Sequence, residues 1–244
     1  MRAIILAAGE GQRLRPLTLD RPKCLVEYRK KPIIDYQIET MRECGIRDIV
    51  LIKGYRQETL ERPGVRYVVN RDYATTNMVW TLFCAESLFN EDLLISYGDI
   101  LYGSSILKPL LESKDDFAVT VSMNWKELWL KRMEDPLKDA ETMKIDEKGC
   151  IRELGKKPRS YDEIQGQYMG LFKIRKGLLP AIKKIYHEAD KNAIYDGKNY
   201  RNMYMTSFIQ LLIDKGIPVK AVKVTGEWLE IDHLDDLKVV CSFA

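Results

Sequence analysis

The chain has 244 residues, with 39 Lys plus Arg against 36 Asp plus Glu and a formal net charge of +3. So small an excess gives no reason to expect binding to nucleic acid or to a membrane surface, and no stretch approaches the roughly 20 apolar residues of a transmembrane helix. The five cysteines are widely spaced and lack a Cys-x-x-Cys pair, which favours a reduced, cytoplasmic protein over a zinc site or a disulfide scaffold.

From residue 3 to residue 123, apolar runs alternate with segments of helical period. In segment 31–45 the apolar residues recur on one stripe, with Pro32 as a start signal and Gly45 as a stop signal. A later helix offers Thr75 or Thr76 as its N-cap. The alternation predicts βαβ units and a parallel sheet covered on both faces. The expected strands are 3–8, 48–55, 65–70, 92–100 and 117–123, and the expected helices are 31–45, 75–89 and 104–113.

After residue 123 the pattern changes. Residues 124–165 are polar and are expected to be irregular, apart from a strand-like stretch at 150–155. Further strands are expected at 166–174, 219–224 and 227–231, and helices at 176–189 and 206–216. The simplest organisation is one domain, 1–244, in which the half 124–244 covers the carboxyl ends of the strands of the half 1–123. Ligands bind at that edge of open parallel sheets.

The loop after the first strand carries cations but fits neither common phosphate-binding motif. No Gly-Lys-Ser/Thr of a P-loop occurs, and Leu14 stands where the dinucleotide fingerprint needs its third glycine. Pro16 would also interrupt a helix that began at Gly11. There remains a flexible turn, followed by Arg13 and Lys23, which suit a polyanion. A strand-end turn with solvated cations is the alternative for a lone glycine loop.

The longer stretch "LAAGEGQRLRPLTLDRPKCLV", residues 6–26, argues against that alternative. It resembles the signature LAAGxGxRLxPLTxxxPKxLV of the nucleotidyltransferases that activate sugar phosphates and related phosphoesters. The resemblance implies an α/β fold, a Rossmann-like three-layer mixed sheet with a substrate-covering C-terminal half. It also implies a nucleoside triphosphate held by the glycine loop, with Arg13 and Lys23 neutralising its phosphates and the departing pyrophosphate. The loop residues assigned to the nucleotide are Leu6, Ala7, Ala8, Gly9 and Gly11.

The reaction of that family needs charge compensation more than it needs a base. The attacking phosphate is already ionised near pH 7, but two anions must meet, which calls for Mg²⁺ on carboxylates. Asp99 and Asp232 follow predicted strands and correspond to the family's metal positions, although each alone could be a capping or turn residue. His233 is expected to be a capping or solvated residue. In "ELGKKP" the resemblance assigns the acceptor's phosphate to Lys157 when the motif is aligned on Pro158, but not when it is aligned on Glu153; a solvated pair of Lys156 and Lys157 is the alternative.

The remaining candidates concern the base and the acceptor. Asn77 is equally plausible as a reader of base or ribose and as a helix-start residue. Glu141 or Glu163 could pair with a protonated amine, although a solvated surface is the simpler reading of both. An aromatic cage for a quaternary ammonium and the packed core of the covering half are alternative interpretations of the aromatic residues there. The candidates for the acceptor pocket are Lys156, Tyr168, Gly170, Trp129, Tyr204 and Trp228, with Trp125 nearby.

The segment "NRDYATTNMVWTLFCA", residues 70–85, is similar to that of short cytidylyltransferases. These enzymes load small phosphorylated alcohols, amines or phosphonates onto CMP, with phosphocholine, phosphoglutamine and aminoethylphosphonate as acceptors. The resemblance implies CTP and a small phosphorylated acceptor as substrates, Mg²⁺ as cofactor and a role in capsule or surface polysaccharide synthesis. A sugar-1-phosphate uridylyl- or thymidylyltransferase is the alternative, and a nucleotide-sensing module without turnover is a third. The acceptor and the oligomeric state, a homodimer included, stay open.

Overall fold

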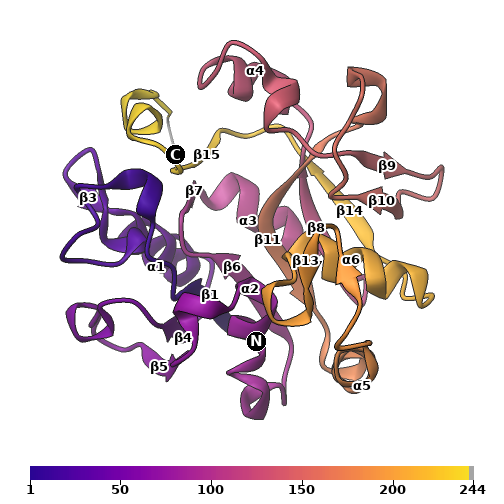
Figure 1. The fold of residues 1–244 in the computed structure, drawn as a ribbon, viewed down its shortest axis with the longest axis horizontal. Coiled ribbons are helices and arrows are strands. Elements are labelled where there is room, and N and C mark those ends of the chain that lie inside the picture. The colour runs from indigo at the N-terminus through magenta and orange to yellow at the C-terminus, as the bar shows by residue number, and fades with distance from the viewer. Residues whose placement is uncertain (242–244) are drawn as a thin grey trace.

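A computed structural model describes residues 1–241 of the chain. Over these residues a sheet of seven strands runs through the molecule in the order β14-β8-β11-β6-β1-β4-β5, with helices packed along it (Figure 1). Helix α1 (Ile33–Glu43) packs beside α3 (Ser104–Glu112), and α2 (Met78–Phe83) contacts α6 (Met205–Asp214). The remaining helices are α4 (Trp125–Leu130) and α5 (Leu179–Glu188).

The strands of the large sheet are β1 (Arg2–Ala7), β4 (Asp48–Lys53), β5 (Arg66–Val69), β6 (Leu93–Tyr97), β8 (Phe117–Ser122), β11 (Gln167–Ile174) and β14 (Lys220–Val224). Short strands pair outside it: β2 (Glu27–Tyr28) with β3 (Lys31–Pro32), β7 (Ile100–Tyr102) with β15 (Trp228–Glu230), β9 (Met143–Ile145) with β10 (Ile151–Leu154), and β12 (Ile194–Tyr195) with β13 (Lys198–Asn199).

The predicted mixed α/β sheet is confirmed. Strand β1 pairs in parallel with β4 and β6, and β4 pairs in parallel with β5. Strand β11 lies antiparallel between β6 and β8, which makes the sheet mixed. Strands β1, β6 and β8 are buried along their whole length, as expected for strands covered on both faces. The carboxyl ends of β1, β4 and β6 therefore meet at one edge.

Two local predictions were wrong. The helix expected at 75–89 is only α2, and neither Thr75 nor Thr76 is its N-cap; the helix-start role that was the alternative for Asn77 is confirmed. The Asn77 side-chain oxygen accepts the backbone N–H of Met78 at 2.8 Å. The segment 124–165 is not wholly irregular, because α4 forms there and buries its apolar side in the large core.

A second, smaller core cluster places the N-terminal loop. Leu14 is fully buried in it against Leu101 of β7 and Leu229 of β15. This packing ties the loop, β7 and β15 into one unit, although they come from distant parts of the sequence. It fixes the neighbours of Leu14, among them Arg13, beside the ends of β7 and β15.

Within residues 1–241, no helix combines the length and apolar character that crossing a bilayer requires.

Candidate active site

Three glycines stand where strands β1, β4 and β6 end. Gly9 follows β1, Gly54 follows β4 and Gly98 follows β6. A Cβ on Gly98 would lie 2.6 Å from the carbonyl oxygen of Leu6, and a Cβ on Gly54 would lie 2.7 Å from that of Ala8. Side chains at these two positions would push the strand ends apart. Gly9 differs, because a Cβ there would meet no atom of the described residues 1–241 within 4 Å, so its missing side chain leaves open space.

That space belongs to a cavity of about 120 Å³, which we call the strand-end cavity. Gly11 is outside its wall; its backbone has φ of +63°, and a Cβ there would lie 2.9 Å from Lys23 Cβ. The loop therefore needs glycine at position 11 to bring Lys23 close. The predicted nucleotide residues on the wall are Leu6, Ala7, Ala8, Gly9 and Asn77, joined by Lys23 and Asp99.

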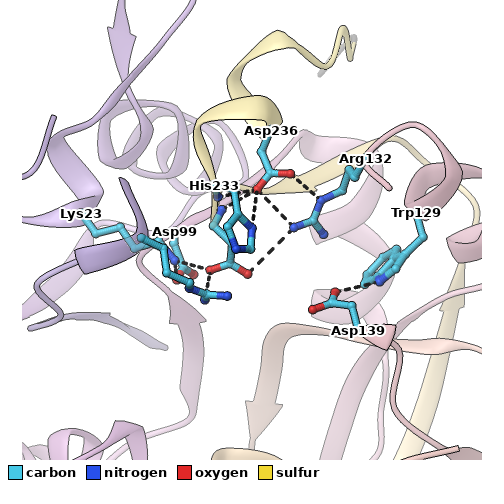
Figure 2. A network of polar contacts seen from close by, with 9 residues as sticks. Lys23, Asp99, Trp129, Arg132, Asp139, His233 and Asp236 are labelled. Atoms are coloured by element: carbon cyan, nitrogen blue, oxygen red, sulfur yellow. Dashed lines mark hydrogen bonds and ion pairs between the residues drawn. The ribbon is translucent and has the colours of Figure 1, made fainter. Parts of the chain in front are cut away.

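Both predicted metal ligands and both predicted loop cations meet at one point. Lys23 Nζ lies 2.6 Å from Asp99 Oδ2 and 2.7 Å from Asp232 Oδ1. Arg13 reaches the same Asp232 oxygen with a distance of 2.6 Å. Figure 2 shows the Lys23 side chain directed at Asp99. The predicted convergence of these four residues is therefore present in the fold.

The antiparallel pairing of β7 with β15 explains how residues so far apart meet. Asp99 immediately precedes β7, and Asp232 lies just beyond the end of β15. Ile100 pairs with Glu230, and the N–H of Ile231 donates to the carbonyl oxygen of Asp99 at 3.0 Å. The start of one strand thus lies beside the end of the other, and the two aspartates face each other.

Glu230 is a third carboxylate at this point that sequence analysis missed. One oxygen each from Asp99, Glu230 and Asp232 lie within 4.8 Å of one another. The signal was present, because Glu230 and Asp232 are two residues apart in extended chain and therefore share a face. Among residues 1–241, Asp99 Oδ1 is buried without a hydrogen-bond partner. An orphaned carboxylate oxygen beside two further carboxylates fits Mg²⁺, which takes oxygen ligands.

The crowding of these carboxylates separates their pKa values. Burial, with Asp232 and Asp99 nearby, raises the pKa of Glu230 well above its usual range. Burial acts in the same direction on Asp232, but Lys23 and the two arginines Arg13 and Arg132 outweigh it and lower the pKa of that carboxyl. Burial disfavours the charged Lys23, yet Asp99 and Asp232 raise its pKa overall. Asp232 is thus anionic and paired, and Lys23 stays cationic.

A larger cavity of about 600 Å³, which we call the lid cavity, adjoins the site on the side of the covering half. Arg13, Asn77 and Asp232 line it, so it meets the charged cluster directly. Gly170 in its wall has φ of +72°, and a Cβ there would lie 2.7 Å from the Tyr97 ring. The predicted acceptor residues on the wall are Trp129, Tyr168, Gly170 and Tyr204.

Three other predicted acceptor residues are not in that wall. Lys156 pairs with Glu153 at 3.4 Å and is exposed. Lys157 Nζ donates to the carbonyl oxygens of Leu137 and Lys138, each at 2.5 Å. These two residues immediately precede Asp139, which lies in the wall. Trp228 is 3% exposed and packs on Trp129 with ring centroids 5.6 Å apart, so it belongs to the core of the covering half.

The lid cavity also contains polar residues that sequence analysis either missed or treated as surface. Asp139 accepts a hydrogen bond from Trp129 Nε1 at 2.9 Å. Burial, with Asp139 and Asp196 nearby, raises the pKa of Glu141 to about 7. Asp139 lies in a segment expected to be irregular, and no spacing in the sequence points to it. Further wall residues that were missed are Tyr97, Gln167, Thr206 and Glu230.

His233 has the expected capping role. It is the N-cap of a short 3-10 helix at Leu234–Lys238, and its backbone N–H donates to Asp236 Oδ2 at 2.7 Å.

Known proteins are similar to this chain in sequence or in fold. Residues 3–202 match the family model described as a MobA-like NTP transferase domain. The sequence is 46% identical to the CTP:phosphoglutamine cytidylyltransferase of Campylobacter jejuni over 98% of this chain and 98% of that protein. The choline-phosphate cytidylyltransferase of Streptococcus pneumoniae is 48% identical over 40% of this chain and 42% of its own length. The solved inositol-1-phosphate CTP transferase of T. maritima has a TM-score of 0.73 at 23% identity, covering 96% of this chain and 90% of its own. That last likeness shows the fold alone.

Proposed function

The chain belongs to the MobA-like NTP transferase family, and from that premise we propose that it transfers CMP from CTP to a small phosphorylated acceptor, releasing pyrophosphate. The predicted nucleotidyltransferase family is confirmed by the family match. The choice of CTP is supported by the relative that is 46% identical over nearly the full chain, a cytidylyltransferase.

The observation that carries the proposal is the position of the charged cluster. Lys23 and Asp99 line the strand-end cavity, while Arg13 and Asp232 line the lid cavity. A nucleotide in the first cavity and a phosphorylated acceptor in the second would place their phosphates at this cluster. A phosphate oxygen of the acceptor then attacks the α-phosphorus of CTP. The bond between that phosphorus and the oxygen that bridges it to the β-phosphate breaks, and pyrophosphate leaves.

This chemistry needs no general base from the protein. A phosphate monoester has its second pKa at about 6 and is therefore mostly a dianion at pH 7. The obstacle is the repulsion between two anions, and Arg13 and Lys23 reduce it by binding the triphosphate. Asp99, Asp232 and Glu230 would hold a divalent ion such as Mg²⁺, which supplies further positive charge to the phosphates. Positioning and charge compensation account for the rate enhancement.

The strand-end cavity favours a ligand that approaches the backbone closely. At Gly9 no side chain of the part of the chain that the structure describes lies between the backbone and the open space. Asn77 uses its side-chain oxygen to cap α2 and its side-chain nitrogen to donate to the carbonyl oxygen of Asn202 at 3.4 Å. Asn77 lines both cavities, which supports a role for its amide in contacting base or ribose while it caps α2.

The lid cavity favours an acceptor that carries a positive nitrogen. Asp139 and Glu141 in its wall carry carboxyl groups. Burial and the nearby Asp139 and Asp196 raise the pKa of Glu141, so a cation bound beside it would stabilise its charged form. An aromatic cage is less well supported, because the Trp129 ring already has Arg132 5.3 Å from its centroid, and the Tyr204 ring has Lys198 at 5.4 Å. Phosphoglutamine and phosphocholine, the acceptors of two relatives, both carry cationic nitrogen. The assignment of Lys157 to the acceptor's phosphate stays a prediction.

The proposal is tested by incubating the protein and Mg²⁺ with CTP, UTP, dTTP, GTP or ATP. Each nucleotide is paired with phosphoglutamine, phosphocholine, phosphoethanolamine or glucose 1-phosphate, and pyrophosphate is assayed. We expect product from CTP with an acceptor that carries a cationic nitrogen, either a protonated amine or a quaternary ammonium. UTP or dTTP with glucose 1-phosphate as the productive pair would favour a sugar-1-phosphate nucleotidyltransferase instead, and no pyrophosphate from CTP with any acceptor would refute the proposal.

Asp232→Asn tests the metal part of the proposal. We expect turnover to fall by orders of magnitude and the Mg²⁺ concentration for half-maximal rate to rise. Asp235→Asn is the matched control, because Asp235 is three residues away and its side chain is 77% exposed. Similar activity in both variants would mean that Asp232 does not serve the metal.

A further inference from the structure

A buried ion pair lies next to the charged cluster without lining either cavity. Arg132 follows α4, and Asp236 lies in the 3-10 helix Leu234–Lys238 after β15. Arg132 Nε is 2.9 Å from Asp236 Oδ1, and the two side chains are 3% and 4% exposed. Burying two charges costs several kcal/mol that their attraction only partly offsets, so such a pair is weak evidence for stability. Its position suggests another purpose.

Asp236 holds the turn that carries Asp232. Its Oδ2 accepts the backbone N–H groups of Asp232 and His233, both at 2.7 Å. One terminal nitrogen of Arg132 also lies 3.9 Å from Asp232 Oδ2. Figure 2 shows Asp236 bonded to Arg132 on one side and to His233 on the other. The orientation of the Asp232 carboxylate thus depends on Asp236, and the orientation of Asp236 depends on Arg132.

Arg132 also contacts the wall of the lid cavity. Its guanidinium carbon lies 5.3 Å from the centre of the Trp129 ring, and Trp129 Nε1 donates to Asp139 at 2.9 Å. In Figure 2 the Trp129–Asp139 pair lies below Arg132. A single arginine from the covering half therefore touches both the acceptor wall and the loop of Asp232.

We propose that Arg132 is a positioning residue that holds the Asp232 carboxylate in the orientation that binds a divalent cation. The inference rests on the proposed function, in which Asp232 is a ligand of that cation. Arginine suits the role because its planar fork reaches the two Asp236 oxygens, at 2.9 and 3.4 Å, while still approaching Asp232. Partners that orient metal ligands change metal affinity by about 10- to 100-fold when they are replaced.

Arg132→Lys keeps the charge and removes the fork. Mn²⁺, a paramagnetic probe for the Mg²⁺ site, is titrated into the protein alone, and the free ion is followed by electron paramagnetic resonance. We expect the dissociation constant for Mn²⁺ to rise about tenfold or more. Arg152→Lys is the matched control, because Arg152 pairs with Asp146 at the surface and its side chain is 60% exposed; its Mn²⁺ affinity should equal that of the wild type.

A second variant separates positioning from folding. Arg132→Met with Asp236→Asn removes both charges, so no buried charge is left unpaired, and the asparagine oxygen keeps an acceptor for the backbone N–H groups. We expect a thermal midpoint near that of wild type together with weakened Mn²⁺ binding. In steady state, either variant should raise the KM for Mg²⁺ more than it lowers kcat at saturating Mg²⁺.

Mn²⁺ affinity within twofold of wild type in both variants would overturn the inference, as would a loss of affinity in the Arg152→Lys control. Because Mn²⁺ binding is measured without nucleotide or acceptor, this result is independent of the substrate panel. Wild-type protein that binds Mn²⁺ but turns over no CTP would refute the proposed function and leave the positioning result to stand. Wild-type protein that binds no Mn²⁺ would overturn the positioning role itself.

Discussion

Replacing Lys23 by methionine should destabilise the protein in a way that Mg²⁺ reverses. The ammonium lies 2.6 Å from Asp99 and 2.7 Å from Asp232, and the side chain is only 14% exposed. At an effective dielectric constant of about 20, a contact of this length corresponds to about 6 kcal/mol of Coulomb attraction. Desolvation of the lysine offsets much of this, so removing one partner of such a buried pair costs about 3–5 kcal/mol.

In a chain of this size, 1 kcal/mol shifts the thermal midpoint by roughly 2–4 °C, so Lys23→Met should lower it by about 10 °C. A divalent ion replaces the lost positive charge among the carboxylates, whereas in wild type it must first displace the ammonium. Mg²⁺ should therefore raise the midpoint of the variant by several degrees more than that of wild type. Calorimetric scans with and without MgCl₂ measure both effects, and turnover should fall by orders of magnitude.

Lys144→Met is the matched control for this experiment. Lys144 pairs with Glu153 at 3.0 Å, but its side chain is 50% exposed. Exposed pairs contribute about 1 kcal/mol or less, so the midpoint should move by no more than a few degrees and should not respond to Mg²⁺. Equal midpoints for Lys23→Met and Lys144→Met, or equal Mg²⁺ responses of Lys23→Met and wild type, would refute the charge argument.

Three further predictions address the cavities. Gly9→Ala should leave the thermal midpoint unchanged, because its Cβ would meet no atom of residues 1–241 within 4 Å. The same variant should weaken CTP binding at least tenfold in calorimetric titration. Gly170→Ala should instead lower the thermal midpoint, because φ of Gly170 is +72° and the Cβ would lie 2.7 Å from the Tyr97 ring. The pKa of Glu141 is raised from 4.5 to about 7, so the folded state holds a proton that the unfolded state has lost, and stability should fall by at most about 3 kcal/mol as pH rises from 4.5 to 7. Glu141→Gln should remove this pH dependence of the free energy of unfolding, measured by urea unfolding. It should also raise the KM for the acceptor above pH 7 without changing the KM for CTP. A pH dependence of stability equal to that of wild type would contradict the role given to Glu141.

The sequence was most informative where the backbone itself makes the site. The glycine-rich motif indicated residues that line the strand-end cavity. Such a prediction is possible because the short motif determines where β1 ends and how closely Lys23 approaches the loop backbone at Gly11. Asp99 and Asp232 were expected at strand ends, and the fold brings them together. Their convergence depends on the pairing of β7 with β15, which no local pattern specifies. Only the resemblance of the motif to a known family indicated it in advance.

Local patterns failed where tertiary contacts decide the structure. Asn77 rather than a threonine caps α2, because its backbone N–H also donates to the carbonyl oxygen of Arg201 at 3.1 Å, which fixes where the helix begins. Helix α4 was missed because only six residues form it, too few for a clear period. The assignment of Lys157 to the acceptor stays a prediction; in the structure its amine donates to the carbonyl oxygens of Leu137 and Lys138, contacts that no local pattern specifies.

Arg132 shows the limit most clearly. It lies in a segment that reads as polar and irregular, it belongs to no motif, and its partner Asp236 is 104 residues away. A polar, charged segment normally predicts a solvated surface, since unpaired buried charges are costly. Here the charge is buried because a carboxylate that already accepts two backbone N–H groups needs a cation to balance it. The requirement arises from the turn after β15, so it becomes visible only when that turn and the covering half are placed together.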